Sequence, residues 1–315
     1  MQSTAFATGQ AVVRVFDFMM RGSEGMGDAA DAWTFAAMNC HHRFYSLDSF
    51  FRTARENGYT AIELWTGPQH FYLDHVGNDP VGRLLELERA HGVKVIGICP
   101  EQTNPKPNNM ACADSSSQER TFKYFCRAID VAHAVQARQV VVTSGWAFLD
   151  EDREAAYDRC VAMLRRLARY ACERGVLLAV EALQPFESVL VNSATDLRDL
   201  IADVGEPSLK ACLDMGAMAC AGETIPEYFK VLGTDIVHVH FVDVEMGEMD
   251  THRAWGDGTR NMADDLFALS EAGYCGALSV ETVSRRYHND PAQADRQSMR
   301  CYLNALDFVR RMRGE

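Results

Sequence analysis

The 315-residue chain has few basic residues and no long apolar run. Lys and Arg number 31 against 44 Asp and Glu, which gives a formal net charge of −13. Nucleic-acid-binding proteins need a basic face to contact phosphates, and anionic membrane surfaces attract basic segments, so this charge argues against both classes. No apolar run approaches the roughly 18 residues of a membrane-spanning helix. With 47% hydrophobic and 24% charged residues, the composition is that of a globular protein.

Several motifs of nucleotide-binding and disulfide-rich proteins are also absent. The ten cysteines form no CxxC pair, and the N-terminus has no basic segment typical of a signal peptide. Disulfide frameworks are typical of small secreted domains, so we expect free thiols and a cytoplasmic location. No GxGxxG follows the first apolar run and no GxxxxGK[ST] occurs, which argues against dinucleotide-binding and P-loop folds.

Short apolar runs rich in Val and Ile alternate with longer amphipathic stretches through most of the chain. The runs are continuous, as in parallel strands that are buried on both faces. We predict strands at 36–40, 61–65, 93–98, 139–143, 176–181, 209–214, 236–242 and 277–281. We predict helices at 46–57, 117–134, 151–174, 193–204, 262–272 and 291–312.

Eight strands, most of them followed by a helix, favour a (β/α)₈ TIM barrel, with an open doubly wound sheet as the alternative. We expect the barrel to occupy residues 36–315 as the catalytic domain. Residues 1–35 are rich in Gly, Ala and Met and do not share the alternation. We therefore predict that they form an N-terminal extension.

Four successive predicted strands carry a metal-ligand type of residue near their C-terminal ends, where barrel enzymes place their active sites. These residues are Glu181, Asp214, His240 and Glu281. Alone, each has a plainer explanation as a loop carboxylate or a core histidine, and His238 has the same side-chain parity as His240. Together, three carboxylates at one mouth would repel unless a cation bound them. Three carboxylates and one imidazole suit Mn²⁺, Mg²⁺ or Co²⁺.

A second group of polar and aromatic residues lies on the loops that follow the predicted strands. The candidates for substrate binding are Glu187, His252, Glu101, His70, Trp65 and Asp250. Solvated loop carboxylates and core packing of the aromatic ring are the alternative explanations. Asp250 and His252 are also a candidate second ligand pair.

Three segments carry a family resemblance: Glu181-Ala-Leu-Gln-Pro-Phe-Glu187, Leu213-Asp-Met-Gly and His238-Val-His-Phe-Val-Asp243. They resemble the xylose-isomerase-like sugar isomerase and epimerase superfamily. Ile62-Glu-Leu-Trp-Thr-Gly67 and Pro100-Glu-Gln-Thr-Asn104 narrow the resemblance to fructoselysine 3-epimerase and its ketose 3-epimerase relatives. The resemblance runs from about residue 36 to the C-terminus.

This resemblance implies a (β/α)₈ barrel with one divalent metal, usually Mn²⁺, held by Glu181, Asp214, His240 and Glu281. It also implies that Glu181 and Glu281 are the acid/base pair and that Glu187 contacts the substrate. Two positions depart from the family's patterns. Met246 stands where ketose epimerases have an Arg, which shifts the expected substrate class. Ala217 stands where the superfamily's multi-metal DNA-repair endonucleases have a His, which argues against a nuclease.

The predicted function is therefore a metal-dependent sugar epimerase or isomerase that transfers a proton next to a carbonyl. Two related alternatives are the catalytic subunit of a C-glycoside deglycosidase, which acts on 3-oxo-glycosides by elimination, and an inosose-type dehydratase. A non-catalytic sugar-binding barrel fits less well, because a binding protein needs no acid/base pair. The expected partners are a small sugar and further copies of the chain, or a small partner subunit in the deglycosidase case.

Overall fold

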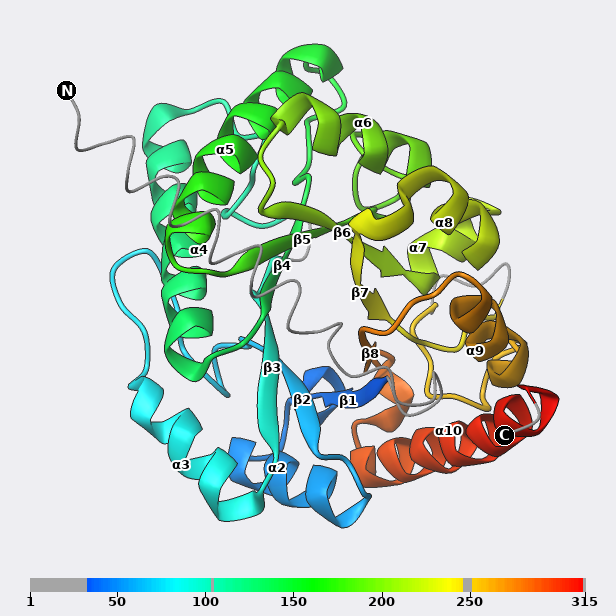
Figure 1. The fold of residues 1–315 in the computed structure, drawn as a ribbon. Helices are drawn as coiled ribbons and strands as arrows, with labels where there is room; N and C mark the ends of the chain where they lie inside the picture. The colour runs from blue at the N-terminus through cyan, green and yellow to red at the C-terminus, as the bar shows by residue number, and fades with distance from the viewer. Residues whose placement is uncertain (1–32, 103–104, 246–250, 314–315) are drawn as a thin grey trace, which may run out of the picture.

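The computed structural model describes residues 33–102, 105–245 and 251–313. Within these residues, eight parallel strands pair in chain order and close into a barrel, with β1 beside β8 (Figure 1). The strands are β1 Thr34–Met38, β2 Ala61–Trp65, β3 Lys94–Cys99, β4 Gln139–Thr143, β5 Leu177–Glu181, β6 Leu209–Asp214, β7 Ile236–His240 and β8 Ala277–Val280. This is a TIM barrel, so the doubly wound alternative is wrong.

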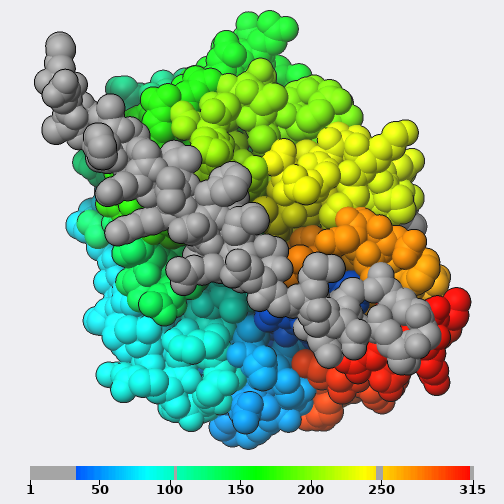
Figure 2. All heavy atoms as spheres, in the orientation of Figure 1, coloured from blue at the N-terminus to red at the C-terminus, as the bar shows by residue number. Residues whose placement is uncertain are grey.

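Helices surround the barrel and connect successive strands (Figure 1). The α-helices are α2 Leu47–Glu56, α3 Val81–His91, α4 Ser115–Val135, α5 Arg153–Glu173, α6 Ala194–Val204, α7 Met215–Cys220, α8 Ile225–Leu232, α9 Met262–Glu271 and α10 Pro291–Arg313. Short 3₁₀ turns are η2 Cys40–His42, η3 Gly233–Asp235 and η4 Arg285–Tyr287. In the space-filling view the colours follow one another around the molecule, because each βα unit lies beside the next (Figure 2).

The predicted elements are all present, with boundaries that shift by a few residues. The first strand is Thr34–Met38 rather than 36–40, and β7 ends at His240 rather than at 242. Three helices were not predicted, namely α3, α7 and α8. The predicted N-terminal extension falls almost wholly on residues 1–32, which lie outside the described residues, so it stays a prediction.

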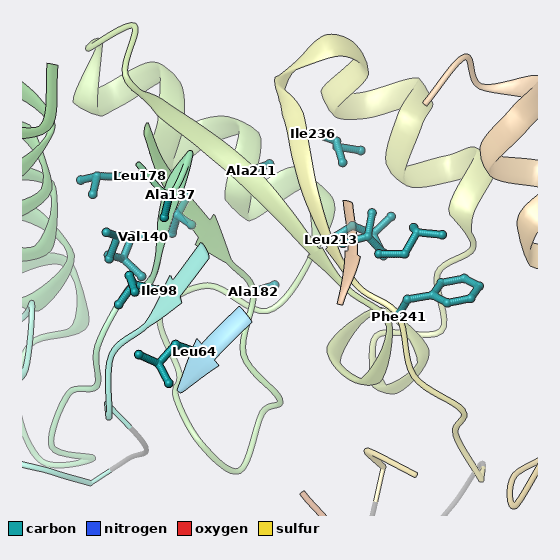
Figure 3. Packing of buried hydrophobic residues seen from close by; sticks show 14 of the residues in the cluster. Leu64, Ile98, Ala137, Val140, Leu178, Ala182, Ala211, Leu213, Ile236 and Phe241 are labelled. Atoms are coloured by element: carbon teal, nitrogen blue, oxygen red, sulfur yellow. The ribbon is translucent and has the colours of Figure 1, made fainter. Parts of the chain in front are cut away.

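The main hydrophobic core lies between the barrel and its helices. Side chains at alternate strand positions point outward, as Val140 of β4 and Leu178 of β5 do side by side (Figure 3). A smaller apolar cluster of Met38, Cys99 and Val141 fills part of the barrel interior. Since neighbouring positions on a strand face opposite sides, the residues that end strands on the inner face point toward the barrel mouth.

The described residues bear on two of the expectations about the class of protein. All ten cysteines lie there and all are free thiols. Among the described helices, none is both long and apolar enough to cross a membrane.

Candidate metal and sugar site

The structure brings the four predicted metal ligands together at the barrel mouth. Glu181, Asp214 and His240 are the last residues of β5, β6 and β7, and Glu281 directly follows β8. The strand register pairs Asp214 with His240, which places their side chains next to each other. One possible ligand atom from each of the four residues lies within 4.8 Å of the others. Residues spread over 100 positions of sequence thus share one site because consecutive strands end at one face.

The imidazole of His240 lies at the centre of this cluster. Its Nδ1 is 3.0 Å from Oε2 of Glu181, 3.0 Å from Oε2 of Glu281 and 3.7 Å from Oδ2 of Asp214. His240 is fully buried, while Glu181 and Asp214 are nearly so. The carboxylates therefore converge on one nitrogen in a place that water reaches poorly.

Asp214 is held in place by the helix that follows it. Its Oδ1 accepts a hydrogen bond from the backbone N–H of Ala217 at 2.5 Å, so Asp214 is the N-cap of α7. Its other oxygen, Oδ2, is 3.0 Å from Nε2 of His252, which comes from the loop after β7. The same nitrogen of His252 is 3.6 Å from Oε2 of Glu281. His252 therefore contacts two of the four predicted ligands.

The unsatisfied atoms of the cluster fit a bound cation. Oε2 of Glu181 and Nδ1 of His240 are both buried and lack a hydrogen-bond partner of acceptable direction, although they are 3.0 Å apart. Buried polar atoms are normally hydrogen-bonded, so two orphaned atoms that face each other need another partner. A hard divalent cation prefers oxygen ligands and accepts an imidazole, and these donors match that preference.

The pKa shifts of Glu181, His240 and the adjacent His252 lead to the same conclusion. Burial, together with repulsion from Glu281 and Asp214, raises the pKa of Glu181 to about 8 despite the attraction of His240. Burial lowers the pKa of His252, but Asp214 together with Glu281 and Glu187 outweighs it, and the pKa rises to about 10. Burial also opposes the charged form of His240, yet the surrounding anionic groups hold its pKa well above its usual value. Protons thus offset the repulsion between these carboxylates, and a cation would replace them.

A cavity of about 400 Å³ opens directly above the cluster. Four of the six residues predicted to bind substrate line it, namely Trp65, Glu101, Glu187 and His252. Burial raises the pKa of Glu187, which favours its protonated form more than at an exposed carboxyl. The cavity is open to a small molecule, and the carboxylates of the predicted metal ligands are part of its lining.

The other two predicted substrate-binding residues are not part of the cavity lining. His70 is buried behind Trp65, where Nδ1 is 2.7 Å from Nδ2 of Asn39 and Nε2 is 2.8 Å from the carbonyl oxygen of Tyr45. Both ring nitrogens have partners, so its position favours a structural role. Asp250 lies outside the described residues.

Two cationic residues of the cavity wall were missed by the sequence reasoning. Arg43 follows β1, and its guanidinium lies 5.3 Å from the centre of the Trp65 ring. Its Nε donates to the carbonyl oxygen of Cys40 at 3.1 Å, and within the described part of the chain it has no carboxylate partner. Lys106 follows β3 and pairs with Glu101. Only their positions shortly after predicted strands could have pointed to them.

A second buried group of histidines and a carboxylate lies outside the cavity. Asp295 of α10 accepts from Nε2 of His41 at 2.9 Å and from Nε2 of His42 at 2.7 Å. All three residues are buried. These two histidines fasten the segment after β1 to the last helix.

The family known as "Xylose isomerase-like TIM barrel" matches residues 51–305 of this sequence. The chain belongs to this family. The predicted superfamily resemblance is therefore confirmed.

The chain is also similar to individual proteins, in sequence or in fold. The chain is 30% identical to fructoselysine 3-epimerase of Shigella flexneri over 260 residues, which cover 82% of this chain and 93% of that protein. A solved D-tagatose 3-epimerase-like protein superposes with a TM-score of 0.72 at 22% identity, over 87% of this chain and 98% of that one. The IOLI protein, solved with a bound zinc atom, superposes with a TM-score of 0.72 at 18% identity, over 88% and 99% of the two chains.

Proposed function

We propose that the chain is a divalent-metal-dependent sugar 3-epimerase. One observation carries the proposal: the carboxylates of Glu181 and Glu281 both lie 3.0 Å from the same nitrogen of His240, at the floor of the cavity. They come from β5 and from the residue after β8, which are not neighbouring strands. Inverting a carbon centre requires a base on one side of the carbon and an acid on the other. Two carboxylates that approach from different sides of the mouth meet this requirement.

The four predicted ligands would hold Mn²⁺, or Mg²⁺ or Co²⁺. When bound there, such a cation supplies Lewis-acid polarisation of a ketone oxygen. Of the protein groups, one of Glu181 and Glu281 takes the proton from the carbon beside the ketone. The other returns a proton to the opposite face of the same carbon. The product therefore has the same atoms as the substrate and differs only in the configuration of that carbon. Glu187 and His252 line the same cavity and are placed to hydrogen-bond sugar hydroxyls.

The residues of the cavity wall favour a substrate in which the sugar is joined to an anionic group. The predicted metal ligands lie at the ends of β5 to β8. On the part of the cavity wall formed by β1 and β2, Arg43 follows β1 and Trp65 is the last residue of β2. A guanidinium without a carboxylate partner in the described residues can hold a substrate carboxylate by charge-assisted hydrogen bonds. The adjacent Trp65 ring offers an apolar surface for a methylene chain. A ketose joined to an amino acid, as in fructoselysine, has both features, and a free ketose has neither.

Deuterium incorporation tests this function. The purified protein, loaded with Mn²⁺, is incubated in D₂O with fructoselysine, its carboxamide analogue, psicose, tagatose or a 3-oxo-glucoside, and the sugars are examined by NMR after the protein is filtered off. We expect deuterium at C3 of a ketose, fastest with fructoselysine, and a loss of exchange in Glu181→Gln and Glu281→Gln. Arg43→Met should slow fructoselysine about 10- to 100-fold and leave psicose within about twofold.

Two other outcomes would contradict the proposal. Release of an aglycone from the 3-oxo compound without C3 exchange on any ketose would assign the protein to the deglycosidase class. Absence of both reactions, with a sugar still bound, would indicate a binding protein. Equal slowing of all ketoses in Arg43→Met would remove the substrate-class argument and leave the epimerase proposal in place.

A further inference from the structure

A line of polar side chains crosses the barrel interior beneath His240. Nε2 of Gln139 is 3.2 Å from Nδ1 of His238, and Nε2 of His238 is 2.5 Å from Oε2 of Glu63. The other oxygen of Glu63, Oε1, is 3.5 Å from Nε2 of His240. Glu63, His238 and His240 have no exposed surface at all. Such groups are costly to bury unless each has a partner, and here the partners are one another.

Strand β3, which lies between β2 and β4, leaves space for these polar side chains. Gly97 of β3 faces the barrel interior, and a Cβ at this position would lie 2.6 Å from Nε2 of Gln139 and 3.4 Å from Cγ of Glu63. Any larger residue would displace the amide that holds His238. A glycine inside a strand often marks such a close approach.

The hydrogen bonds fix where the protons are. An ionised Glu63 only accepts, so both imidazoles must present an N–H through Nε2. Gln139 donates to Nδ1 of His238, which confirms that His238 carries its proton on Nε2. When His240 is neutral and donates its Nε2–H to Glu63, its Nδ1 is left with a free lone pair. That nitrogen is the one that faces Glu181 and Glu281.

We propose that Glu63 is a positioning residue that fixes the Nε2–H tautomer of His240 and thereby sets the protein's affinity for its divalent metal. This inference rests on the metal site of the proposed function. Glu63 itself does not line the cavity and is not one of the four predicted metal ligands. Carboxylates behind metal-binding histidines orient the ring and raise its basicity, and their loss typically weakens metal binding about 10- to 100-fold.

The test compares two buried carboxylates that each lie against two imidazoles. In Glu63→Gln the two carboxylate oxygens are replaced by an amide oxygen, which accepts, and an amide NH₂, which donates. The histidine that faces the NH₂ must then present a bare Nε2, so its proton moves to Nδ1. Asp295→Asn makes the same chemical change at His41 and His42, away from the cavity. We expect Glu63→Gln to weaken Mn²⁺ binding about 10- to 100-fold in calorimetric titration. Asp295→Asn should leave the Mn²⁺ dissociation constant within about twofold.

A second measurement uses the wild-type protein and does not depend on a variant that folds. In the Zn²⁺-loaded protein, ¹⁵N NMR of the imidazoles should show His240 with a slowly exchanging Nε2–H and with Nδ1 as the metal ligand. Ligation through Nε2, or equal Mn²⁺ affinities in wild type and Glu63→Gln, would overturn the inference. If wild type binds no Mn²⁺ at all, the proposed function fails as well, whereas normal wild-type binding with no effect of Glu63→Gln removes only the role of Glu63.

Discussion

Two buried clusters of histidines and carboxylates in the described part of the barrel differ in whether their carboxylate oxygens are satisfied. In the first, one carboxylate, Asp295, lies between two imidazoles and accepts a hydrogen bond of 2.7 to 2.9 Å from each, so both of its oxygens are satisfied, although Nδ1 of His41 has no partner among the described residues. In the second, three carboxylates surround one imidazole, and buried atoms of Glu181 and His240 have no hydrogen-bond partner. One carboxylate between two imidazoles has a donor for each of its oxygens. In the second cluster three carboxylates share His240 and His252, so they retain negative charge that a bound cation would offset. Residue type alone therefore does not identify a metal site.

The largest expected difference between the clusters is in catalysis. Glu181→Gln and Glu281→Gln should each slow C3 proton exchange by about 10³-fold, because each removes one of the two groups proposed to transfer a proton. Asp295→Asn should leave the rate within a few fold under conditions where it is folded. Initial rates of deuterium uptake measure this. Full activity in Glu181→Gln would show that the second cluster is not the reaction centre.

The next effect concerns stability. Asp295→Asn should lower the free energy of unfolding by about 3 to 5 kcal/mol, because it removes one partner of a buried, hydrogen-bonded group. Burial raises the pKa of Asp295, but His41 and His42 outweigh it and hold the pKa at about 2. The folded pKa is below the unfolded value of about 3.9, so this contribution is present above pH 4 and is lost as the pH falls toward 2.

Urea denaturation at several pH values checks this prediction. The difference between wild type and Asp295→Asn should be large at pH 7 and should shrink below pH 4. A difference that stays constant over this range would mean that the ionised carboxylate of Asp295 does not stabilise the fold.

Variants of the two clusters should also differ in how much Mn²⁺ stabilises them against unfolding. Mn²⁺ at 100 times its dissociation constant should raise the free energy of unfolding by about 2.7 kcal/mol in wild type. The same increase is expected in Asp295→Asn, and none in Asp214→Asn at that concentration. Thermal or urea unfolding with Mn²⁺ and with a chelator provides the measurement. An equal increase in Asp214→Asn would place the cation elsewhere.

The smallest effect is expected at Gly216 in α7. A Cβ there would lie 2.5 Å from Cε1 of His252, so Gly216→Ala must push the imidazole away from Asp214. Overpacking of this kind costs about 1 to 3 kcal/mol. We expect KM for the sugar to rise about tenfold with Mn²⁺ binding nearly unchanged. Gly82→Ala is the control, because Gly82 has open space around it and a φ outside the left-handed region, and it should change neither KM nor Mn²⁺ binding. Gly92 is unsuitable because its φ is positive.

The sequence predicted the barrel and its four-residue cluster for one physical reason. Parallel strands are continuous apolar runs, so a charged residue that ends such a run is conspicuous and its place at the mouth follows from the fold. Glu181 and Asp214 were both found in this way. Helix α8 was missed although Thr224 and Glu227 form a capping box that could have been recognised. Helix α3 was harder to recognise, because its N-cap residue Pro80 offers no side-chain acceptor.

The rest of the site could not be predicted, because it depends on distances between residues that are far apart in sequence. Whether Glu63 faces His238 or solvent is decided by the barrel's closure, which brings together residues 175 positions apart. His70 follows a strand just as Arg43 does, yet one is buried by Asn39 and the other lines the cavity. Loop side chains are placed by their local contacts and not by periodicity, so their roles follow only from the structure.

The most direct test of the central claim is the stoichiometry of Mn²⁺ binding, measured from the free-ion signal in electron paramagnetic resonance. We predict one Mn²⁺ per chain in wild type and in Asp295→Asn, and loss of that site in both Asp214→Asn and Glu281→Gln. A wild-type protein that binds no Mn²⁺, Mg²⁺ or Co²⁺, or a site that survives both Asp214→Asn and Glu281→Gln and disappears in Asp295→Asn, would contradict the account.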